Sequence, residues 1–346
     1  MGSLFSSYSS SIPYKDSIKK FITLRNGNLA VLELYDINIF SGANLEKILT
    51  ISPDPDSEDN LIIPQRVHSS KLYLIDLIQV NNGNLIVVLN YAIKVIRLSE
   101  NNSYEIIQTI TRGFQKFFYK IIEIKKDLFC FETSSLSEEG VKSYQIQIYN
   151  YNLNNNNYNH STTLKVGNYV IDSLYLDTNE LVYFDGKVKF LNLDTWNTKN
   201  VEDNFIFDNY LKDNNIICKL DNNHILVCDN KFFYIINIVN YTIDKKINNH
   251  IDNIFIKSMK NDSKGNIMVL MVDNPHLRIC KPTFYKKKDY FIIYKYNNLN
   301  LEKVFELEES NFRINCFHKY PDNQIIFYMS SRVDESEYIK TLGINL

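Results

Sequence analysis

The chain has 346 residues, of which 45% are hydrophobic and 23% charged, and its formal net charge is −2. This hydrophobic content supplies a core and excludes wholesale disorder, and the near-neutral charge argues against a general nucleic-acid binder, which carries a basic surplus. No stretch approaches the roughly 18 uninterrupted apolar residues of a membrane span, and the N-terminus lacks the pattern of a secretory signal.

The five cysteines are an odd number and show no metal-ligand spacing. Three of them, Cys130, Cys218 and Cys228, lie in strand-like runs, where a small buried hydrophobe is the expected role. This use of cysteine fits a reducing compartment, so we expect a cytoplasmic protein. The abundance of Tyr, Phe, Ile and Val favours strands over helices.

A short pattern recurs from the N-terminus onward, at intervals of about forty to sixty residues. In its first instance "KKFITL" is a strand, "RNGN" a tight turn, "LAVLEL" a strand, "YD" a turn, "INIFSG" a third strand and "EKILTI" a fourth. The first turn and the third strand then reappear, as in "NNGN" with "IKVIRL" and "SKGN" with "FIIYKY". Seven such turns and seven third strands indicate seven units.

Four-stranded units that repeat at this spacing are typical of a β-propeller, in which packing the blades against one another buries both faces of each sheet. We therefore predict an all-β, seven-bladed propeller that occupies residues 1–346 as a single domain. The seventh unit lacks a fourth strand, so we expect the N-terminal segment to pair there and close the ring. The predicted blades are 18–51, 74–110, 119–166, 170–201, 215–247, 254–307 and 313–346, with the N-terminal strand at 4–12.

The third strands and the turns before them resemble the WD-repeat propellers, whose third strand reads Ile-Lys-Ile-Trp-Asp after a turn that carries Asp. "YDINIF", "FDGKVKF" and "CDNKFFY" supply that aspartate as Asp36, Asp185 and Asp229, and Asp273 stands at the same point of the sixth unit. No unit carries Trp-Asp, so the resemblance is degenerate, although it covers nearly the whole chain. We expect these aspartates to accept backbone N–H groups in tight turns.

The long connections gather on one side of the predicted disc. They are second-to-third-strand loops and blade-to-blade links, which open on the same side: 52–71, 132–143, 202–215, 273–290 and 330–337. The Asn-rich stretch 152–162 is the exception on the opposite side. Insertions collected on one face of a repeat fold indicate a binding face.

Two of these loops carry the residue types that anchor protein interfaces, aromatic side chains and arginine. The predicted partner-binding residues are Arg278, Phe284, Tyr285, Lys286, Lys287, Lys288, Phe205, Phe207 and Tyr210.

No catalytic or metal-binding motif is present. The six histidines are scattered, and no H-E-x-x-H, G-x-S-x-G or phosphate-binding glycine loop occurs. We therefore predict no enzyme activity, no metal and no cofactor. Besides the two functions considered below, a hydrolase or lyase in the central channel is a third possibility. It would require inward-facing acids at the channel mouth.

We predict a non-catalytic scaffold, similar in role to WD-repeat proteins, that is monomeric by itself and binds protein partners within a complex through the long-loop face. The alternative is a peripheral membrane protein. The start "MGSLFS" fits N-myristoylation at Gly2, and the Lys286–Lys288 loop could contact lipid headgroups. One acyl chain gives only marginal binding, so membrane contact would be weak.

Overall fold

The computed structural model describes most of the chain as strands and short turns. The described residues are 10–14, 18–53, 74–89, 92–111, 116–125, 128–136, 142–166, 170, 172–201, 216–229, 232–249, 254–262, 264–273, 288–320, 324–334 and 336–343. The chain divides into two compact units, a first unit of Asp16–Gly167 and a second unit of Met1–Lys15 with Asn168–Leu346. Each unit is described by itself. No helix that could span a membrane occurs among the described residues.

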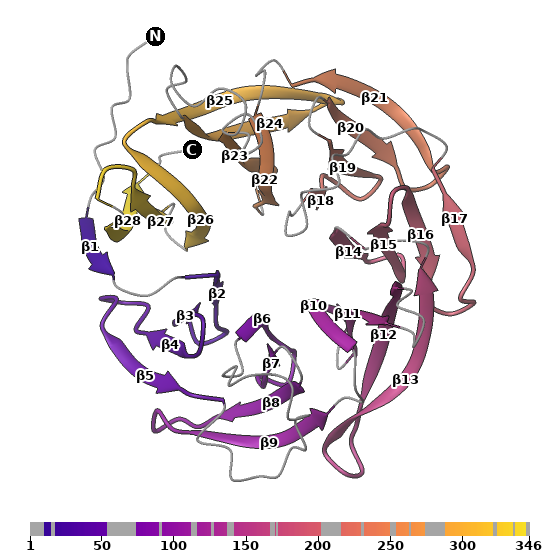
Figure 1. Ribbon diagram of the computed structural model, residues 1–346. Coiled ribbons are helices and arrows are strands. Elements are labelled where there is room, and N and C mark those ends of the chain that lie inside the picture. Colours follow the sequence, from indigo (N-terminus) through magenta and orange to yellow (C-terminus); the bar gives the residue numbers. More distant parts are fainter. Residues whose placement is uncertain are drawn as a thin grey trace. The chain divides into compact units, whose positions relative to one another are not determined.

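The first unit holds three four-stranded antiparallel sheets (Figure 1). Blade one is β2 (Lys20–Thr23), β3 (Leu29–Leu32), β4 (Ile37–Phe40) and β5 (Lys47–Ile51). Blade two is β6 (Leu74–Gln79), β7 (Leu85–Leu89), β8 (Ala92–Leu98) and β9 (Tyr104–Thr111). Blade three is β10 (Lys116–Lys125), β11 (Leu128–Leu136), β12 (Lys142–Asn152) and β13 (Asn157–Val166).

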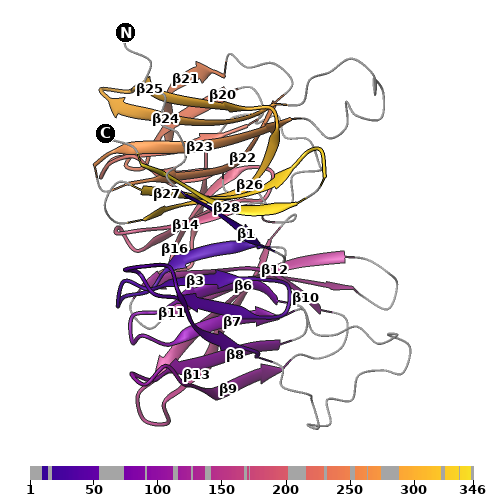
Figure 2. The ribbon, with the colours of Figure 1, turned by 90° about the vertical axis from the view of Figure 1, so that its left-hand side faces the viewer.

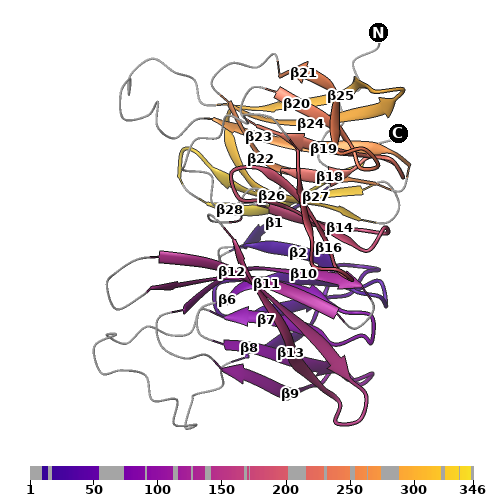
Figure 3. The same ribbon diagram turned by 90° about the vertical axis from the view of Figure 1, so that its right-hand side faces the viewer.

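The second unit holds four more sheets of the same kind (Figure 3). Blade four is β14 (Asp172–Leu176), β15 (Glu180–Phe184), β16 (Val188–Asn192) and β17 (Thr198–Asn200). Blade five is β18 (Ile217–Lys219), β19 (His224–Cys228), β20 (Phe232–Asn237) and β21 (Thr242–Asn248). Blade six is β22 (Ile254–Asn261), β23 (Asn266–Asp273), β24 (Asp289–Asn297) and β25 (Asn300–Glu309).

Blade seven takes its outer strand from the N-terminus. It consists of β26 (Phe312–Tyr320), β27 (Gln324–Ser331), β28 (Glu337–Gly343) and β1 (Ser10–Tyr14). β1 runs antiparallel to β28, with Ser10 opposite Thr341 (Figure 2). Residues 4–9 of the expected N-terminal strand lie outside the described residues, and the closure of the ring stays a prediction, as does the single domain.

Seven sheets of four antiparallel strands confirm the predicted fold class, a seven-bladed β-propeller. The packing follows from the sequence. The second strands β3, β7 and β15 are buried along their whole length, because sheets cover both of their faces. Outer strands such as β21 alternate between exposed and half-buried residues, as expected for one covered face. Cys130 in β11, Cys218 in β18 and Cys228 in β19 are buried, as predicted.

An aspartate at the inner edge of blade four joins it to blade five. Asp172 begins β14 and is 2% exposed. Its Oδ1 accepts the backbone N–H of Ser173 at 2.9 Å, and its Oδ2 accepts those of Ile216 and Ile217 at 2.7 and 2.8 Å. The carboxylate therefore satisfies backbone donors at the start of the next blade, where buried N–H groups would otherwise be unpaired.

Asp76 makes the same connection in the first unit. Its Oδ1 accepts the backbone N–H of Leu77 at 2.8 Å, and its Oδ2 accepts that of Ile121 in blade three at 2.9 Å. The Lys20 ammonium of blade one lies 2.7 Å from Oδ1. We call Asp76 and Asp172 the inner-edge aspartates.

The aspartates of the turns before the third strands have local structural roles. Asp229 accepts the backbone N–H of Phe232 at 2.7 Å, as expected, and also the Tyr234 hydroxyl at 2.7 Å. Asp185 pairs with Lys189 through their side chains. Asp36 accepts a hydrogen bond from the Ser52 hydroxyl at 2.6 Å. The side chain of Asp273 lies outside the described residues.

Four expected loops are shorter than the sequence indicates. Of the loop 273–290, Asp273 belongs to β23 and residues 289–290 to β24. Residues 132–136 and 142–143 continue β11 and β12, with Leu136 opposite Lys142. Residues 330–331 and 337 belong to β27 and β28, and residues 157–162 of the Asn-rich stretch belong to β13. Polar Ser, Thr and Asn residues suggested loops, but backbone pairing extends these strands past the end of the apolar pattern.

Candidate functional site

The outer edge of blade four differs from that of the other blades. β17 has three residues, against five in β5, eight in β9, ten in β13 and seven in β21. Thr198, Lys199 and Asn200 are all exposed. The short outer strand leaves the neighbouring surface of blade five uncovered.

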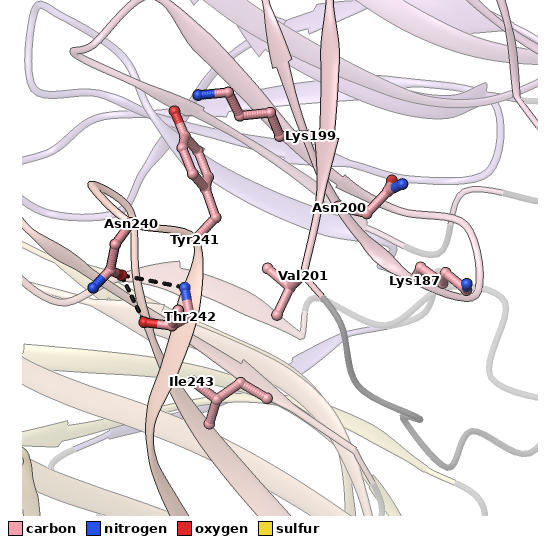
Figure 4. A pocket seen from close by; sticks show the side chains of 8 residues that line it. All are labelled: Lys187, Lys199, Asn200, Val201, Asn240, Tyr241, Thr242 and Ile243. Atoms are coloured by element: carbon pink, nitrogen blue, oxygen red, sulfur yellow. Dashed lines mark hydrogen bonds between the residues drawn. The ribbon is translucent and has the colours of Figure 1, made fainter.

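The space beside β17 is a groove with a volume of about 980 Å³. Figure 4 shows Tyr241 and Lys199 together at one end of this groove, and Lys187 on the far side of Val201. We call it the β17–β21 groove. Its described lining residues are Lys187, Lys199, Asn200, Val201, Asn240, Tyr241, Thr242 and Ile243.

Tyr241 forms one wall of the groove and is fixed by contacts with blade four. Its ring lies edge-on to Phe190 at 5.0 Å between centroids, and its hydroxyl donates to Glu180 Oε1 at 2.9 Å. The Lys199 ammonium lies 4.3 Å from the ring centroid. Burial raises the pKa of Tyr241, and the Glu180 carboxylate raises it further.

The backbone of Tyr241 is in the left-handed region, with φ of 62°. A bulky residue rarely adopts this conformation, because its Cβ approaches the neighbouring carbonyl. The turn that carries it is closed by the Tyr241 N–H, which donates to the carbonyl of Asn237 at 3.0 Å. Strained residues persist where surrounding contacts hold them, and here the contacts with blade four hold the ring in place as a wall of the groove.

The lining offers hydrogen-bond donors and positive charge. It contains two lysines and no carboxylate among its described residues, and neither lysine forms an ion pair with a described residue. Asn240 Oδ1 accepts from both the backbone N–H and the hydroxyl of Thr242, which leaves the amide NH₂ to donate (Figure 4). Val201 and Ile243 supply apolar surface. A ligand with carboxylates or other acceptors suits this lining.

One end of the groove lies at the end of blade four from which the predicted long loop 202–215 departs. Lys187 belongs to the turn between β15 and β16, and the Val201 N–H donates to the carbonyl of Val188 beside that turn at 3.0 Å. In an antiparallel meander this turn and the exit of the fourth strand share one end of the sheet.

The predicted partner-binding residues lie outside the described residues with one exception. These residues are Phe205, Phe207, Tyr210, Arg278, Phe284, Tyr285, Lys286 and Lys287. The exception is Lys288, which pairs with Glu308 at 2.6 Å; this hydrogen bond raises the pKa of the lysine. Gly2 also lies outside, so the acylation and the basic membrane loop stay predictions.

One histidine lies between two carboxylates, and one of these, Asp244, also accepts the hydroxyl of the groove-lining Thr242 at 3.4 Å. The Nδ1 of His224 is 3.0 Å from Asp221, and its Nε2 is 3.1 Å from Asp244. The amide of Asn237 also donates to Asp244, at 3.0 Å. The cluster thus ties the turn before β19 to β21. The described residues contain no group of three or more His, Cys, Asp or Glu side chains placed to hold a metal ion.

Sequence reasoning missed both the inner-edge aspartates and the groove. "YLIDLIQ" and "YVIDSLY" share an Ile-Asp pair at the first strand of a unit, which could have identified Asp76 and Asp172. The fourth strand of the fourth unit, "TWNTKNV", lacks the apolar alternation of "EKILTI" and "YEIIQTI". That loss of pattern was the available signal for an outer strand with an uncovered neighbour.

Comparison with known proteins supports the fold. No protein-family model and no curated protein matches the sequence significantly. Among solved structures, the AfRom2 CNH domain matches with a TM-score of 0.56 and 11% identity, over 97% of this chain and 99% of that chain. The WD40 domain of SCAP from fission yeast matches with a TM-score of 0.50 and 10% identity, over 97% of this chain and 90% of that chain.

Virginiamycin B lyase from Staphylococcus aureus, in a catalytically inactive form with quinupristin, matches with a TM-score of 0.58 and 9% identity, over 97% of this chain and 99% of that chain. At these identities the likeness lies in the fold alone, and it extends to a WD40 domain and to an enzyme. The chain is therefore a seven-bladed β-propeller.

Proposed function

We propose that this chain is a non-catalytic protein-interaction module that binds protein partners at the long-loop end of its blades and along the adjoining β17–β21 groove. The observation that carries the proposal is the groove itself. It is walled by a strained but fixed tyrosine and lined by lysines without a described acidic partner and by amide donors, and it contains no described acid or base placed for catalysis.

The buried acids of the described residues support a non-catalytic role, because structural bonds engage them. The inner-edge aspartates bind backbone N–H groups of the next blade. Asp262 pairs with Lys319, and Asp289 pairs with Arg332 at 2.8 Å. A general acid or base needs a free position toward a substrate, and these carboxylates face backbone or cationic partners instead.

The predicted anchors on the loops belong to the same proposal. Phe205, Phe207 and Tyr210 come four to nine residues after the groove-lining Val201 in the sequence, and Arg278, Phe284 and Tyr285 come between β23 and β24. Aromatic residues and arginine contribute most of the binding energy in protein interfaces. We propose that they contribute affinity for the partner, in a cytoplasmic complex.

The test is co-purification from the native cell, with mass spectrometry and a C-terminal tag on a flexible linker. Stoichiometric protein partners that remain through washing, and that are lost with Arg278→Ala/Phe284→Ala/Tyr285→Ala or with Lys187→Glu/Lys199→Glu, support the proposal. A matched control, Lys47→Glu/Lys165→Glu, changes two exposed lysines of outer strands in the first unit. Recovery of the protein alone, or only with membranes, contradicts the proposal.

A further inference from the structure

The β17–β21 groove has an electrostatic preference. Lys187 and Lys199 approach it from one blade, while Asn240 and Thr242 line it from the other. The nearby carboxylate of Glu180 is already hydrogen-bonded by Tyr241 and by the Thr178 hydroxyl, the latter at 3.0 Å. Asp244, which accepts the Thr242 hydroxyl at 3.4 Å, also lies between His224 and the Asn237 amide. Neither Lys187 nor Lys199 forms an ion pair with a described residue, and their positive charge favours a ligand with carboxylates.

The groove also has a free strand edge. β17 is the last strand of its sheet and pairs on one side only, with Lys199 opposite Phe190. Alternate N–H and C=O groups of its other side therefore have no strand partner among the described residues. Such an edge accepts an extended peptide as an added strand. Three residues of β17 span about 10 Å, so a segment of about four to six residues covers the edge and reaches both lysines.

A second copy of this chain fits the edge poorly. Symmetric pairing of two β17 strands would place the Lys199 side chains of both copies close together, and like charges across a strand pair are destabilising. Lysine on an exposed edge strand acts against self-association of this kind. An acidic partner strand gains from the same charge.

We infer that the β17–β21 groove binds an extended, acidic segment of a partner protein. The carboxylates of that segment contact Lys187 and Lys199, its backbone pairs with the free edge of β17, and its apolar side chains meet Val201, Tyr241 and Ile243. This inference rests on the proposed function and names the class of partner at that site.

The first experiment selects peptides from a random twelve-residue display library on the full chain. We expect wild-type protein to enrich peptides rich in Asp and Glu with alternating apolar residues. The affinity of the best peptide, measured by fluorescence polarisation, falls at least tenfold with Lys187→Glu/Lys199→Glu and changes less than twofold with the control Lys47→Glu/Lys165→Glu. Circular dichroism checks that each variant is folded.

A second measurement tests the extended conformation without altering the protein. N-methylation of the selected peptide at alternate residues blocks strand pairing in one of the two registers and leaves the other intact. We expect the peptide methylated on one set of alternate residues to lose at least tenfold in affinity, and the peptide methylated on the other set to lose little. Equal loss in both registers, or in neither, overturns the strand-addition part of the inference.

Other occupants give other results. Enriched peptides without acidic bias, or acidic peptides that bind the Lys187→Glu/Lys199→Glu variant as tightly as wild type, overturn the inference. Dimerisation of the wild type that this variant abolishes, seen by analytical ultracentrifugation, points to a second copy instead. If millimolar inorganic phosphate displaces acidic and neutral peptides equally well, the groove binds a small anion, and the inference is overturned. If co-purified partners persist in the same variant, the inference fails and the proposed function stands.

Discussion

The rim between blades two and three and the rim between blades four and five are built differently. In the first unit, the Gln108 side chain of β9 donates to the Tyr158 carbonyl of β13 at 2.9 Å and accepts the Tyr158 N–H at 2.7 Å. The Tyr158 hydroxyl in turn accepts from Asn82 at 3.2 Å. In the second unit, the described contact between β17 and the turn before β21 is the cation–π pair of Lys199 and Tyr241.

The inner edges of the same two pairs of blades are alike, because Asp76 and Asp172 make the same backbone bonds. Cohesion between blades is therefore provided at the inner edge, and the rim is free to close or to stay open. A closed rim adds stability, and an open rim with exposed donors offers a site. Residues of the inner edge thus hold these blades together, whereas residues of the open rim are the ones we propose to bind a partner.

The largest expected effect comes from the inner-edge aspartates. Asp76→Ala and Asp172→Ala each leave buried backbone N–H groups unpaired, and we expect each to lower the free energy of unfolding by about 3 kcal/mol or more. Asp177→Ala is the control, because its carboxylate is 84% exposed and pairs only with Lys219 among the described residues, so the change should stay below about 1 kcal/mol. Urea unfolding followed by circular dichroism measures all three; a small loss at either inner-edge position would show that the inner edges do not hold the blades together.

The next effect concerns the wall of the groove. Tyr241→Asn keeps a residue that tolerates positive φ but removes the ring and the bond to Glu180, and we expect a loss of about 2 kcal/mol. Trp196 occupies the corresponding turn of blade four with φ of 60° and is 39% exposed. Trp196→Asn should lower the free energy of unfolding by less than half as much as Tyr241→Asn does, as measured by thermal and urea unfolding. Equal losses would mean that the contacts of Tyr241 with blade four do not offset its strain.

A smaller effect separates the two rims directly. Gln108→Ala removes both hydrogen bonds to Tyr158 and should lower the free energy of unfolding by about 1.5 kcal/mol. Lys199→Ala removes an exposed cation–π contact and should lower it by about 0.5 kcal/mol or less. A cost for Lys199→Ala as large as that for Gln108→Ala would indicate that the open rim is a structural contact rather than a site.

The smallest effect is the pH dependence of a closed interface. Tyr294 packs on Phe233 between blades five and six, and burial, followed by the charge of Glu306, raises its pKa from 10.0 to about 12. Between these values the folded chain keeps a proton that the unfolded chain has lost. The stabilisation is complete below about pH 10 and is lost as the pH rises through 12. Between pH 8 and pH 11.5, the free energy of unfolding in urea should fall by about 1 kcal/mol less for Tyr294→Phe than for wild type. Identical pH profiles would contradict the assignment of this pH dependence to Tyr294.

The fold could be predicted because the repeated turn and third strand mark every blade, and because runs such as "LAVLEL" and "LIVVLN" are apolar on both faces. The strand ends were less predictable, since pairing carries polar segments such as 132–136 into β11. The groove could not be predicted residue by residue. It depends on Lys187 and Tyr241, which lie in turns of two different blades, and on Val201, which follows β17; only packing brings them together.

Hydrogen–deuterium exchange of the full chain, with and without the best acidic peptide, locates the peptide on the protein. We predict that amides of residues 197–201 and 240–243 exchange severalfold more slowly with the peptide bound, while those of 157–166 in the closed rim are unchanged. No slowing at 197–201, or slowing confined to the loop residues 278–288, would contradict a binding site in the β17–β21 groove.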